Sequence, residues 1–441
     1  MLKSTKIAQN SYYEVWNLCF GGAFVSRFII EGGNKMEGEI TVQGSKNAVL
    51  PILAATVLSD GKNVIYNCPK LSDVDMTAKV LESLGCKVDA RKDCIEVDAS
   101  GMSGHTIPDE LMRQMRSSII FLGAIIARCG KAEISMPGGC EIGIRPIDLH
   151  LSALKKLGVN ITESHGFIHC VREKIQPADI HLDFPSVGAT ENIMLTACMT
   201  EGVTTVENAA REPEIVDLER FLNRMGAKIR GAGTDRITIE GVHKLYGAAH
   251  TIIPDRIVAA TYLACALASG GTVVLKGANG GHMGAMISVL KNMGAEIYED
   301  KQKIVLLSPK KLKSIGTIKT MPYPGFPTDI QSPFMALATQ CEGSSVFVEN
   351  IFENRFRHVE ELLRMGADIK ADGRVAVVIG KSRLTGAKVT APDLRGGASL
   401  IVAALASDGT TEIENIKYID RGYEAVEEIL SPCGIDIKRK E

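Results

Sequence analysis

The sequence predicts an α/β protein of two similar domains, each made of three repeated units with buried helices inside and sheets around them. A chain of 441 residues is too long for one ordinary core, so two domains of about 200 residues each are expected. Two patterns, a helix end and an Ala-rich helix, each recur six times in step along the chain. Six units over two domains give three units each, with a cleft between domains as the expected ligand site.

The first pattern is a helix end followed by a strand, Leu-x-x-Leu/Met/Cys-Gly-apolar-x-Ile/Val. Its glycines are spaced by 73, 68, 68, 72 and 68 residues. Apolar residues three apart lie on one helical face, and glycine is the usual residue after a helix end. These glycines are Gly85, Gly158, Gly226, Gly294, Gly366 and Gly434.

The second pattern is an Ala-rich helix, then glycine, then a strand. Such helices are apolar on almost every side, so we expect them to be buried, while the more charged helix of each unit should lie outside. The six copies are residues 52–65, 122–134, 196–206, 263–275, 335–348 and 402–413.

Polar residues mark the start of each Ala-rich helix. Free N–H groups and the positive end of the helix dipole lie there, so several converging starts would bind an anion. Capping explains the Ser, Thr and Asp residues. It does not explain cations in the same register, because a cation opposes the dipole. These cations are Lys46, Arg116, Arg256 and Arg395.

A glycine-rich segment at residues 137–146 precedes the outer helix of the second unit. It places Cys140 between Gly139 and Gly143, with Arg145 five residues further on. A cysteine is more often a small buried residue. Here the glycines favour an exposed thiol, and the nearby cation favours its reactive thiolate. We therefore predict that Cys140 is a reactive group at the cleft.

Composition limits the partners. Lys and Arg number 50 and Asp and Glu 52, for a net charge of −2, so neither nucleic acid nor an anionic membrane is expected as a partner. Eleven cysteines without CxxC pairs fit a reducing cytoplasm. Nine dispersed histidines show no ligand spacing, so we expect no metal and no cofactor. The longest apolar run, near residues 119–127, is too short to cross a membrane.

Seven groups of residues together resemble the UDP-N-acetylglucosamine 1-carboxyvinyltransferases, a family of enolpyruvyl transferases. The resemblance covers about residue 27 to the end. The segments are Gly-Ser-Lys-Asn-Ala at 44–48, Met-Arg-Ser-Ser at 115–118, Pro-Gly-Gly-Cys at 137–140 with Gly-Ile-Arg-Pro at 143–146, Glu-Asn-Ala-Ala-Arg-Glu-Pro-Glu at 207–214, Phe-Pro-Thr-Asp at 326–329, Phe-Glu-Asn-Arg-Phe at 352–356 and Ile-Asp-Arg-Gly-Tyr at 419–423.

The family's fold is two inside-out α/β barrels of three repeats each, in agreement with the repeat count. We expect residues 45–253 to form the first barrel domain, and residues 27–44 plus 254–441 to form the second. Residues 1–26 are expected to be an N-terminal extension outside the fold, and the segment before Val25 to be an over-called start.

The resemblance implies transfer of the enolpyruvyl group of phosphoenolpyruvate to the 3′-hydroxyl of UDP-N-acetylglucosamine, with release of phosphate. This is the first committed step of peptidoglycan precursor synthesis. The reaction is an addition and then an elimination through a tetrahedral ketal. A proton must reach the methylene carbon of phosphoenolpyruvate and another must leave the sugar hydroxyl. Fixed charges must hold the carboxylate and the phosphate.

The same resemblance assigns residue roles. Cys140 is the general acid and can add covalently to phosphoenolpyruvate, Asp329 is the base for the 3′-hydroxyl, and Lys46 and Arg421 complete the catalytic set. The expected ligands of phosphoenolpyruvate are Lys46, Asn47, Arg145, Arg355, Arg395 and Arg421. The expected ligands of the nucleotide sugar are Asn47, Arg116, Arg145, Pro146, Ile147, Asp148, Leu149, Ser186, Val187, Gly188, Asp329 and Ile351. Matching positions nearer the hinge, where structural ion pairs are equally expected, are Asp255, Arg256 and Asp393.

One position departs from the family pattern. Some family members have lysine two residues before the Ser-Val-Gly segment, where it contacts the diphosphate, and here that residue is Phe184. The departure puts one diphosphate contact in doubt and gives Arg116 more of that role.

Three alternative functions fit the sequence less well. The shikimate-pathway enolpyruvyl transferase shares the fold and the donor but lacks the Pro-Gly-Gly-Cys segment. A non-catalytic duplicate that binds UDP-sugars is disfavoured because Lys46, Cys140, Asp329 and Arg421 are all present. An RNA-binding protein of the cyclase-like repeat kind is disfavoured by the near-neutral charge. The sequence predicts no oligomeric state.

Overall fold

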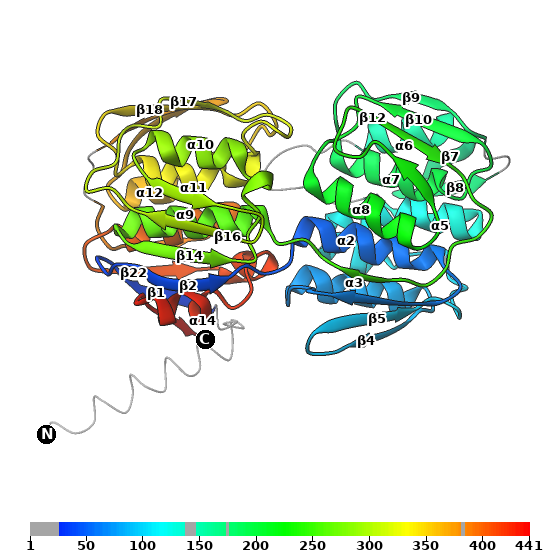
Figure 1. Cartoon of the computed structure of the whole chain (residues 1–441), viewed down its shortest axis with the longest axis horizontal. Helices are drawn as coiled ribbons and strands as arrows, with labels where there is room; N and C mark the ends of the chain where they lie inside the picture. Colours follow the sequence, from blue (N-terminus) through cyan, green and yellow to red (C-terminus); the bar gives the residue numbers. More distant parts are fainter. Residues whose placement is uncertain (1–25, 137–146, 173–175, 381–383) are drawn as a thin grey trace, which may run out of the picture.

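A computed structural model describes residues 26–136, 147–172, 176–380 and 384–441, apart from the side chain of Arg116 (Figure 1). Two lobes lie side by side, each with helices enclosed by sheets. Over the described residues, no helix combines the length and the apolar character that a membrane span requires.

Among the described residues, the N-terminal lobe contains α-helices, short 3-10 helices (labelled η) and three sheets. Its helices are α2 (Lys46–Ala55), η1 (Thr56–Leu58), α3 (Ser72–Ser83), α4 (Asp109–Gln114), η2 (Arg116–Ile120), α5 (Phe121–Cys129), α6 (Asp148–Lys156), α7 (Val187–Ala197) and α8 (Pro213–Arg224). Its strands are β3 (Lys62–Tyr66), β4 (Lys87–Ala90), β5 (Cys94–Asp98), β6 (Lys131–Ser135), β7 (Val159–Ser164), β8 (Phe167–Arg172), β9 (Asp179–His181), β10 (Val203–Glu207), β11 (Lys228–Arg230), β12 (Arg236–Glu240) and β13 (Ala249–Thr251). The described strands pair in the orders β13-β3-β5-β4, β6-β8-β7 and β11-β12-β10-β9.

The C-terminal lobe repeats this plan. Its helices are α9 (Arg256–Ser269), η3 (Gly280–His282), α10 (Gly284–Asn292), α11 (Thr328–Ala338), α12 (Val359–Arg364), α13 (Leu394–Leu405), η4 (Ile416–Arg421), α14 (Val426–Leu430) and η5 (Ser431–Cys433). Its strands are β1 (Arg27–Glu31), β2 (Glu37–Thr41), β14 (Thr272–Lys276), β15 (Glu296–Glu299), β16 (Lys303–Leu307), β17 (Thr317–Lys319), β18 (Ser344–Val348), β19 (Asp368–Asp372), β20 (Val375–Ile379), β21 (Lys388–Thr390), β22 (Thr410–Glu414) and β23 (Asp436–Lys440). The described strands pair in the orders β21-β22-β1-β23, β15-β16-β14-β2 and β17-β18-β20-β19.

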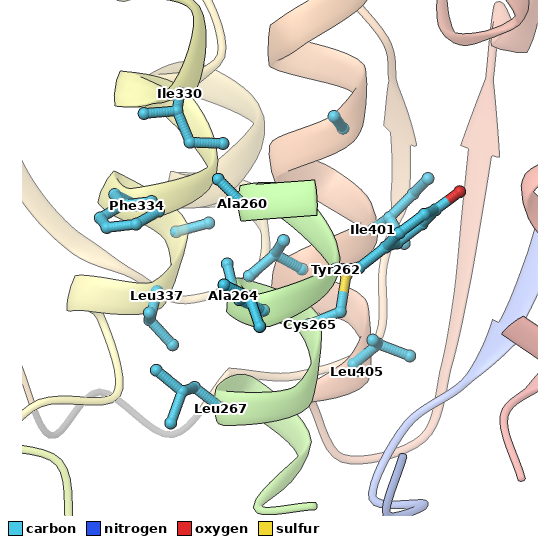
Figure 2. Close-up of a cluster of buried hydrophobic side chains, with 14 of the residues drawn as sticks. Ala260, Tyr262, Ala264, Cys265, Leu267, Ile330, Phe334, Leu337, Ile401 and Leu405 are labelled. Carbon is cyan, nitrogen blue, oxygen red and sulfur yellow. The ribbon is translucent and has the colours of Figure 1, made fainter. Parts of the chain in front are cut away.

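The Ala-rich helices are buried, as their composition predicts. In the C-terminal lobe, α9, α11 and α13 pack against one another. Figure 2 shows Tyr262 of α9 beside Ile401 of α13, with Phe334 of α11 on the other side of α9. Every residue of α9 from Arg256 to Leu267 is buried. Such helices owe their position to this packing, because they present no polar face to water.

Glycine ends the outer helix of each unit, as the first repeat pattern predicts. The six glycines all have a positive φ, for example 94° at Gly85 and 106° at Gly226. Residues with a Cβ are strained in this conformation, so glycine is the residue that turns the chain from helix to strand. The predicted α/β class, with helices inside and sheets around them, is confirmed.

Two chain segments cross between the lobes and lie side by side. The Ser45 N–H donates to the Ile253 carbonyl at 2.8 Å, and the Asp255 N–H donates to the Gln43 carbonyl at 2.9 Å. Before the first crossing, β1 pairs with β22 and β23, and β2 runs parallel to β14. Strands from the start of the chain thus complete sheets of the C-terminal lobe. Lys46 follows directly after the first crossing between the lobes.

Candidate active site

Helices α2 and α9 start at the crossing, and one carboxylate caps both. Oδ1 of Asp255 accepts from the N–H groups of Ile257 and Val258, at 2.8 and 3.0 Å. Its Oδ2 accepts from the N–H of Lys46 at 3.1 Å. Ser45 makes no capping hydrogen bond from its side chain, contrary to the simple capping that its position suggests. Asp255 therefore fixes two helix starts against each other.

Lys46 and Arg421 meet on one carboxylate, that of Asp73 in α3. The Lys46 Nζ lies 2.6 Å from Asp73 Oδ2. The Arg421 Nε donates to Asp73 Oδ1 at 2.9 Å, and its Nη2 donates to Asp73 Oδ2 at 3.3 Å. Lys46 and Asp73 belong to the N-terminal lobe and Arg421 to the C-terminal lobe, so this triad joins both lobes.

Burial and charge act against each other on this triad. Burial lowers the pKa of the Lys46 ammonium, Asp73 opposes that effect, and Arg421 and Arg395 add to the lowering. Burial on its own would raise the pKa of Asp73, but Lys46 and Arg421 outweigh it, so the pKa lies below its usual value.

Asp329, in the first turn of α11, lies between two guanidinium groups. Its Oδ1 is 3.2 Å from the Arg355 Nη2, and its Oδ2 is 3.0 Å from the Arg395 Nη2. Arg355 also donates to the Thr328 carbonyl at 3.1 Å, and Arg395 donates to the Tyr423 hydroxyl at 3.4 Å. Four of the predicted anion-binding cations are thus held by two carboxylates, Asp73 and Asp329.

Both arginines that flank Asp329 keep an unused buried donor. In the described part of the chain, Nε of Arg355 and Nε of Arg395 have no acceptor. A buried donor without a partner costs about 1–3 kcal/mol. An anion with several oxygens offers such acceptors, and arginine suits carboxylate and phosphate geometry. The arrangement is therefore suited to binding a small anion beside Asp329.

Glu349 links three parts of the loops beside α11, and it is not among the residues predicted from the sequence. The carboxylate accepts from the Thr320 and Thr328 hydroxyls at 2.8 and 3.0 Å, and from the Ile351 N–H at 2.8 Å. It thereby ties the start of α11 to Ile351, one of the predicted nucleotide-sugar ligands. Its signal in sequence is weak, because a glutamate directly after a strand is usually exposed.

The starts of α6 and α7 bring two predicted nucleotide-sugar segments together. His150 of α6 lies against Gly188 of α7, where an added Cβ would be only 2.8 Å from the imidazole Cε1. Asn192 orients the ring, because its Oδ1 accepts from the Gly123 N–H at 2.7 Å and its Nδ2 therefore faces His150 Nδ1 at 2.8 Å. An acceptor at Nδ1 leaves the ring proton of neutral His150 at Nε2, beside Gly188.

The segments that meet here are 147–149 and 186–188. Ser186 caps α7 by accepting from the Ala189 N–H at 3.3 Å. The N-terminal end of α7 lies beside that of α6, where His150 and Gly188 meet. Asp148 is exposed, and Ile147 and Leu149 are half-buried, as is Asn47 at the start of α2. Paired helix starts supply N–H groups and positive dipole ends of the kind that bind a diphosphate.

Other predicted residues fall elsewhere or outside the described residues. Cys140, Arg145 and Pro146 lie outside them, as does the side chain of Arg116. Phe184 is 42% exposed. Arg256 pairs with Glu214 of α8 at 3.0 Å, and Asp393 accepts from N–H groups at the start of α13. Arg256 and Asp393 therefore have structural roles, which is one of the two alternatives expected for these positions near the hinge.

Comparison with known proteins places the chain in a family. A family model described as EPSP synthase (3-phosphoshikimate 1-carboxyvinyltransferase) matches residues 30–430, and the chain belongs to this family. Similar proteins include UDP-N-acetylglucosamine 1-carboxyvinyltransferase 2 of Caldanaerobacter subterraneus subsp. tengcongensis, 53% identical over 94% of this chain and 100% of that protein. The UDP-N-acetylglucosamine 1-carboxyvinyltransferase of Halothermothrix orenii is 49% identical, with the same shares covered. The resemblance that the seven segments indicate is thus confirmed.

Solved structures with the same fold include the enolpyruvyl transferase NikO from Streptomyces tendae. It aligns with a TM-score of 0.86 and 24% identity over 94% of this chain and 99% of that chain. EPSP synthase from Acinetobacter baumannii aligns with a TM-score of 0.74 and 19% identity over 94% of this chain and 100% of that chain. These similarities support the two-lobed α/β fold.

Proposed function

We propose that this protein transfers the enolpyruvyl group of phosphoenolpyruvate to the 3′-hydroxyl of UDP-N-acetylglucosamine and releases phosphate. The reaction would take place in the cytoplasm as the first committed step of peptidoglycan precursor synthesis. The observation that carries this proposal is the 53% identity to a UDP-N-acetylglucosamine 1-carboxyvinyltransferase along the whole of that relative. Identity to the EPSP synthase structure is only 19%, which favours the nucleotide sugar as acceptor.

The cations support phosphoenolpyruvate as the donor. Its carboxylate and phosphate are separate anionic groups, and the site offers Lys46 and Arg421 on Asp73 and Arg355 and Arg395 on Asp329. The unused Nε donors of Arg355 and Arg395 are suited to the oxygens of one such group. In the proposed site Arg145 and Asn47 complete the set of residues that bind phosphoenolpyruvate.

The proposed chemistry starts with an addition. The sugar 3′-oxygen bonds to C2 of phosphoenolpyruvate while its proton passes to Asp329. The double-bond electrons take a proton from the Cys140 thiol onto the methylene carbon, which becomes a methyl group. The Asp329 carboxylate is placed to stabilise the positive charge that develops at C2, and the fixed arginines stabilise the negative charge of the phosphate without having to reorient.

An elimination completes the proposed reaction. The bond between C2 and the phosphate oxygen breaks, inorganic phosphate leaves, and the methyl group returns a proton to the Cys140 thiolate, which restores the double bond. Residues 147–149 and 186–188, with Asn47, Arg116, Arg145, Pro146 and Ile351, would hold the nucleotide sugar so that its 3′-oxygen faces Asp329. The paired starts of α6 and α7 support placing the diphosphate there.

A phosphate-release assay with two acceptors tests this proposal. The full chain is mixed with phosphoenolpyruvate and either UDP-N-acetylglucosamine or shikimate 3-phosphate. We expect phosphate release that depends on UDP-N-acetylglucosamine and a background rate with shikimate 3-phosphate. Release that depends on shikimate 3-phosphate would reject the acceptor, and no release with either acceptor, despite binding of the nucleotide sugar, would favour a non-catalytic binder.

A further inference from the structure

Asp73 makes the closest ion pairs around the proposed phosphoenolpyruvate site. The proposed reaction nevertheless assigns Asp73 no chemical step. Only 4% of its surface is exposed. Its carboxylate pairs with the Lys46 ammonium and accepts two hydrogen bonds from the Arg421 guanidinium. Lys46 is also buried, with 8% exposure. Two cations from different lobes therefore share one buried anion.

Among the residues that the structure describes, the groups that face Lys46 come from four elements. Asp73 of α3 binds its ammonium, while Arg421 of η4 and Arg395 of α13 act on it as like charges. Asp255, at the start of α9, binds its backbone N–H. Asp73 is the carboxylate in direct contact with the ammonium. Without it, a buried ammonium would face two guanidinium groups, and desolvation and repulsion would both favour the neutral amine.

We propose that Asp73 is a positioning residue for the anionic donor, because its carboxylate holds the Lys46 ammonium and the Arg421 guanidinium together across the two lobes. The inference rests on the proposed function, which makes phosphoenolpyruvate the anion that these two cations bind. Asp73 does not touch the donor. It keeps Lys46 charged in a buried place and keeps the planar Arg421 fork turned toward Lys46.

A purely structural role and the proposed role differ in how donor binding depends on pH. Binding should weaken as pH rises through the pKa of Lys46, because the neutral amine no longer attracts the donor. Asp73 raises that pKa. In Asp73→Asn the alkaline decline should therefore begin at lower pH, by about one pH unit or more. A structural defect would instead weaken binding by the same factor at every pH.

Calorimetric titration with phosphoenolpyruvate, without acceptor, measures this directly in the full chain. Between about pH 7 and about pH 10 the phosphate group keeps its charge, so the protein supplies the decline. At about pH 7 we expect Asp73→Asn to bind phosphoenolpyruvate more weakly than the wild type, because Lys46 and Arg421 are no longer held together. At about pH 9 its deficit relative to the wild type should have grown by a further threefold or more. Asp75→Asn, an exposed neighbour in the same helix, should behave as the wild type.

Two further variants keep the test decisive. Asp73→Glu retains the charge, so its decline should stay at the wild-type pH even if its affinity falls. Lys46→Arg keeps its charge throughout this range, so the decline should disappear in it and in Lys46→Arg combined with Asp73→Asn. An unchanged decline in Asp73→Asn, or a shifted decline in Asp73→Glu, would overturn the inference. Neither result depends on turnover, so phosphate release by the wild type separately decides the proposed function.

Discussion

At the residue scale, the site is organised by two carboxylates rather than by free cations. Asp73 holds Lys46 and Arg421, and Asp329 holds Arg355 and Arg395. Breaking one partner of a buried pair leaves an uncompensated charge, which typically costs about 3–5 kcal/mol. The cations are therefore in place before any substrate binds, which lowers the cost of ordering them around an anion.

Asp329→Ala should abolish turnover and leave most binding of UDP-N-acetylglucosamine. Loss of a positioned base costs about 10²–10⁴-fold in rate, while many other groups hold the nucleotide sugar. Phosphate release and calorimetric titration with the nucleotide sugar measure the two effects separately. Asp368→Ala, on an exposed strand of the same lobe, is the matched control. If nucleotide-sugar binding disappears together with turnover, Asp329 is an anchor rather than the base.

Because the proposed reaction makes Cys140 a reactive thiol, Cys140→Ser should lose most activity and become insensitive to fosfomycin, an epoxide that alkylates thiols. A serine hydroxyl is a far weaker acid than a thiol and a poor nucleophile for the epoxide. Mass spectrometry of the intact chain after treatment should show one adduct on the wild type and none on the variant. Cys68→Ser is the control, because burial raises the pKa of that thiol to about 12. Wild-type turnover that survives excess fosfomycin would contradict the assigned reactivity of Cys140.

At the element scale, the proposed place of the nucleotide sugar rests on where helix starts meet. The starts of α6 and α7 touch through His150 and Gly188, and those of α2 and α9 share the carboxylate of Asp255. The repeats predict that polar helix starts converge. They do not predict which starts touch, because that depends on packing between units that are far apart in sequence.

Gly188→Ala should weaken binding of UDP-N-acetylglucosamine by about tenfold or more, because a 1 Å displacement in a site can cost that much or more. The new methyl would lie 2.8 Å from the His150 imidazole, which Asn192 holds in place. Calorimetric titration checks the change. The matched control is Gly284→Ala at the start of α10, where an added Cβ meets nothing within 4 Å. Wild-type affinity in Gly188→Ala would remove this contact from the account.

A buried acid is visible in the sequence only through the pattern around it. In α3 the buried residues are Asp73, Val74, Thr77, Val80 and Leu81, so Asp73 occupies the apolar face of its helix. The position of Asp73 on this apolar face is the sequence signal that could have identified it as a buried acid. An acid in the first turn of a helix is, however, also common because it complements the dipole. Its partner Arg421 is 348 residues away, and no local pattern links the two.

At the scale of the whole molecule, the six repeats predict the fold and the family segments predict most of the site. The structure pairs Lys46 and Arg421 with Asp73, and pairs Asp329 with Arg355 and Arg395, and the roles of these residues stay predictions. The ion-pair partners were missed because they cross between lobes, as Asp73 and Glu214 do. Cys140 and Arg145 lie outside the described residues, so their roles stay predictions.

A crowded set of acids lies around the ion pair between Glu214 and Arg256. Glu191 of α7 is buried, and burial, followed by Glu214 and Glu212, raises the pKa of its carboxyl well above the usual 4.5. The folded protein therefore keeps this proton at pH values where the unfolded chain releases it. Stability from this group is complete below about pH 4.5 and is lost as pH rises toward the raised pKa.

Glu191→Gln should remove that loss. We expect the variant to be more stable than the wild type by about 1 kcal/mol or more at pH 7, and equally stable near pH 4. Urea unfolding at both pH values measures the difference. Glu201→Gln, an exposed site, should change neither value. A variant that is less stable than the wild type at pH 7 would show that the Glu191 carboxylate has a stabilising partner.

The most direct test of the central claim is the identity and amount of the products. Phosphorus and proton NMR can follow a mixture of the full chain, phosphoenolpyruvate and UDP-N-acetylglucosamine. The account predicts equal amounts of inorganic phosphate and of a new vinyl ether on the sugar 3′-oxygen. Phosphate formed together with pyruvate, while UDP-N-acetylglucosamine remains unchanged, would contradict it.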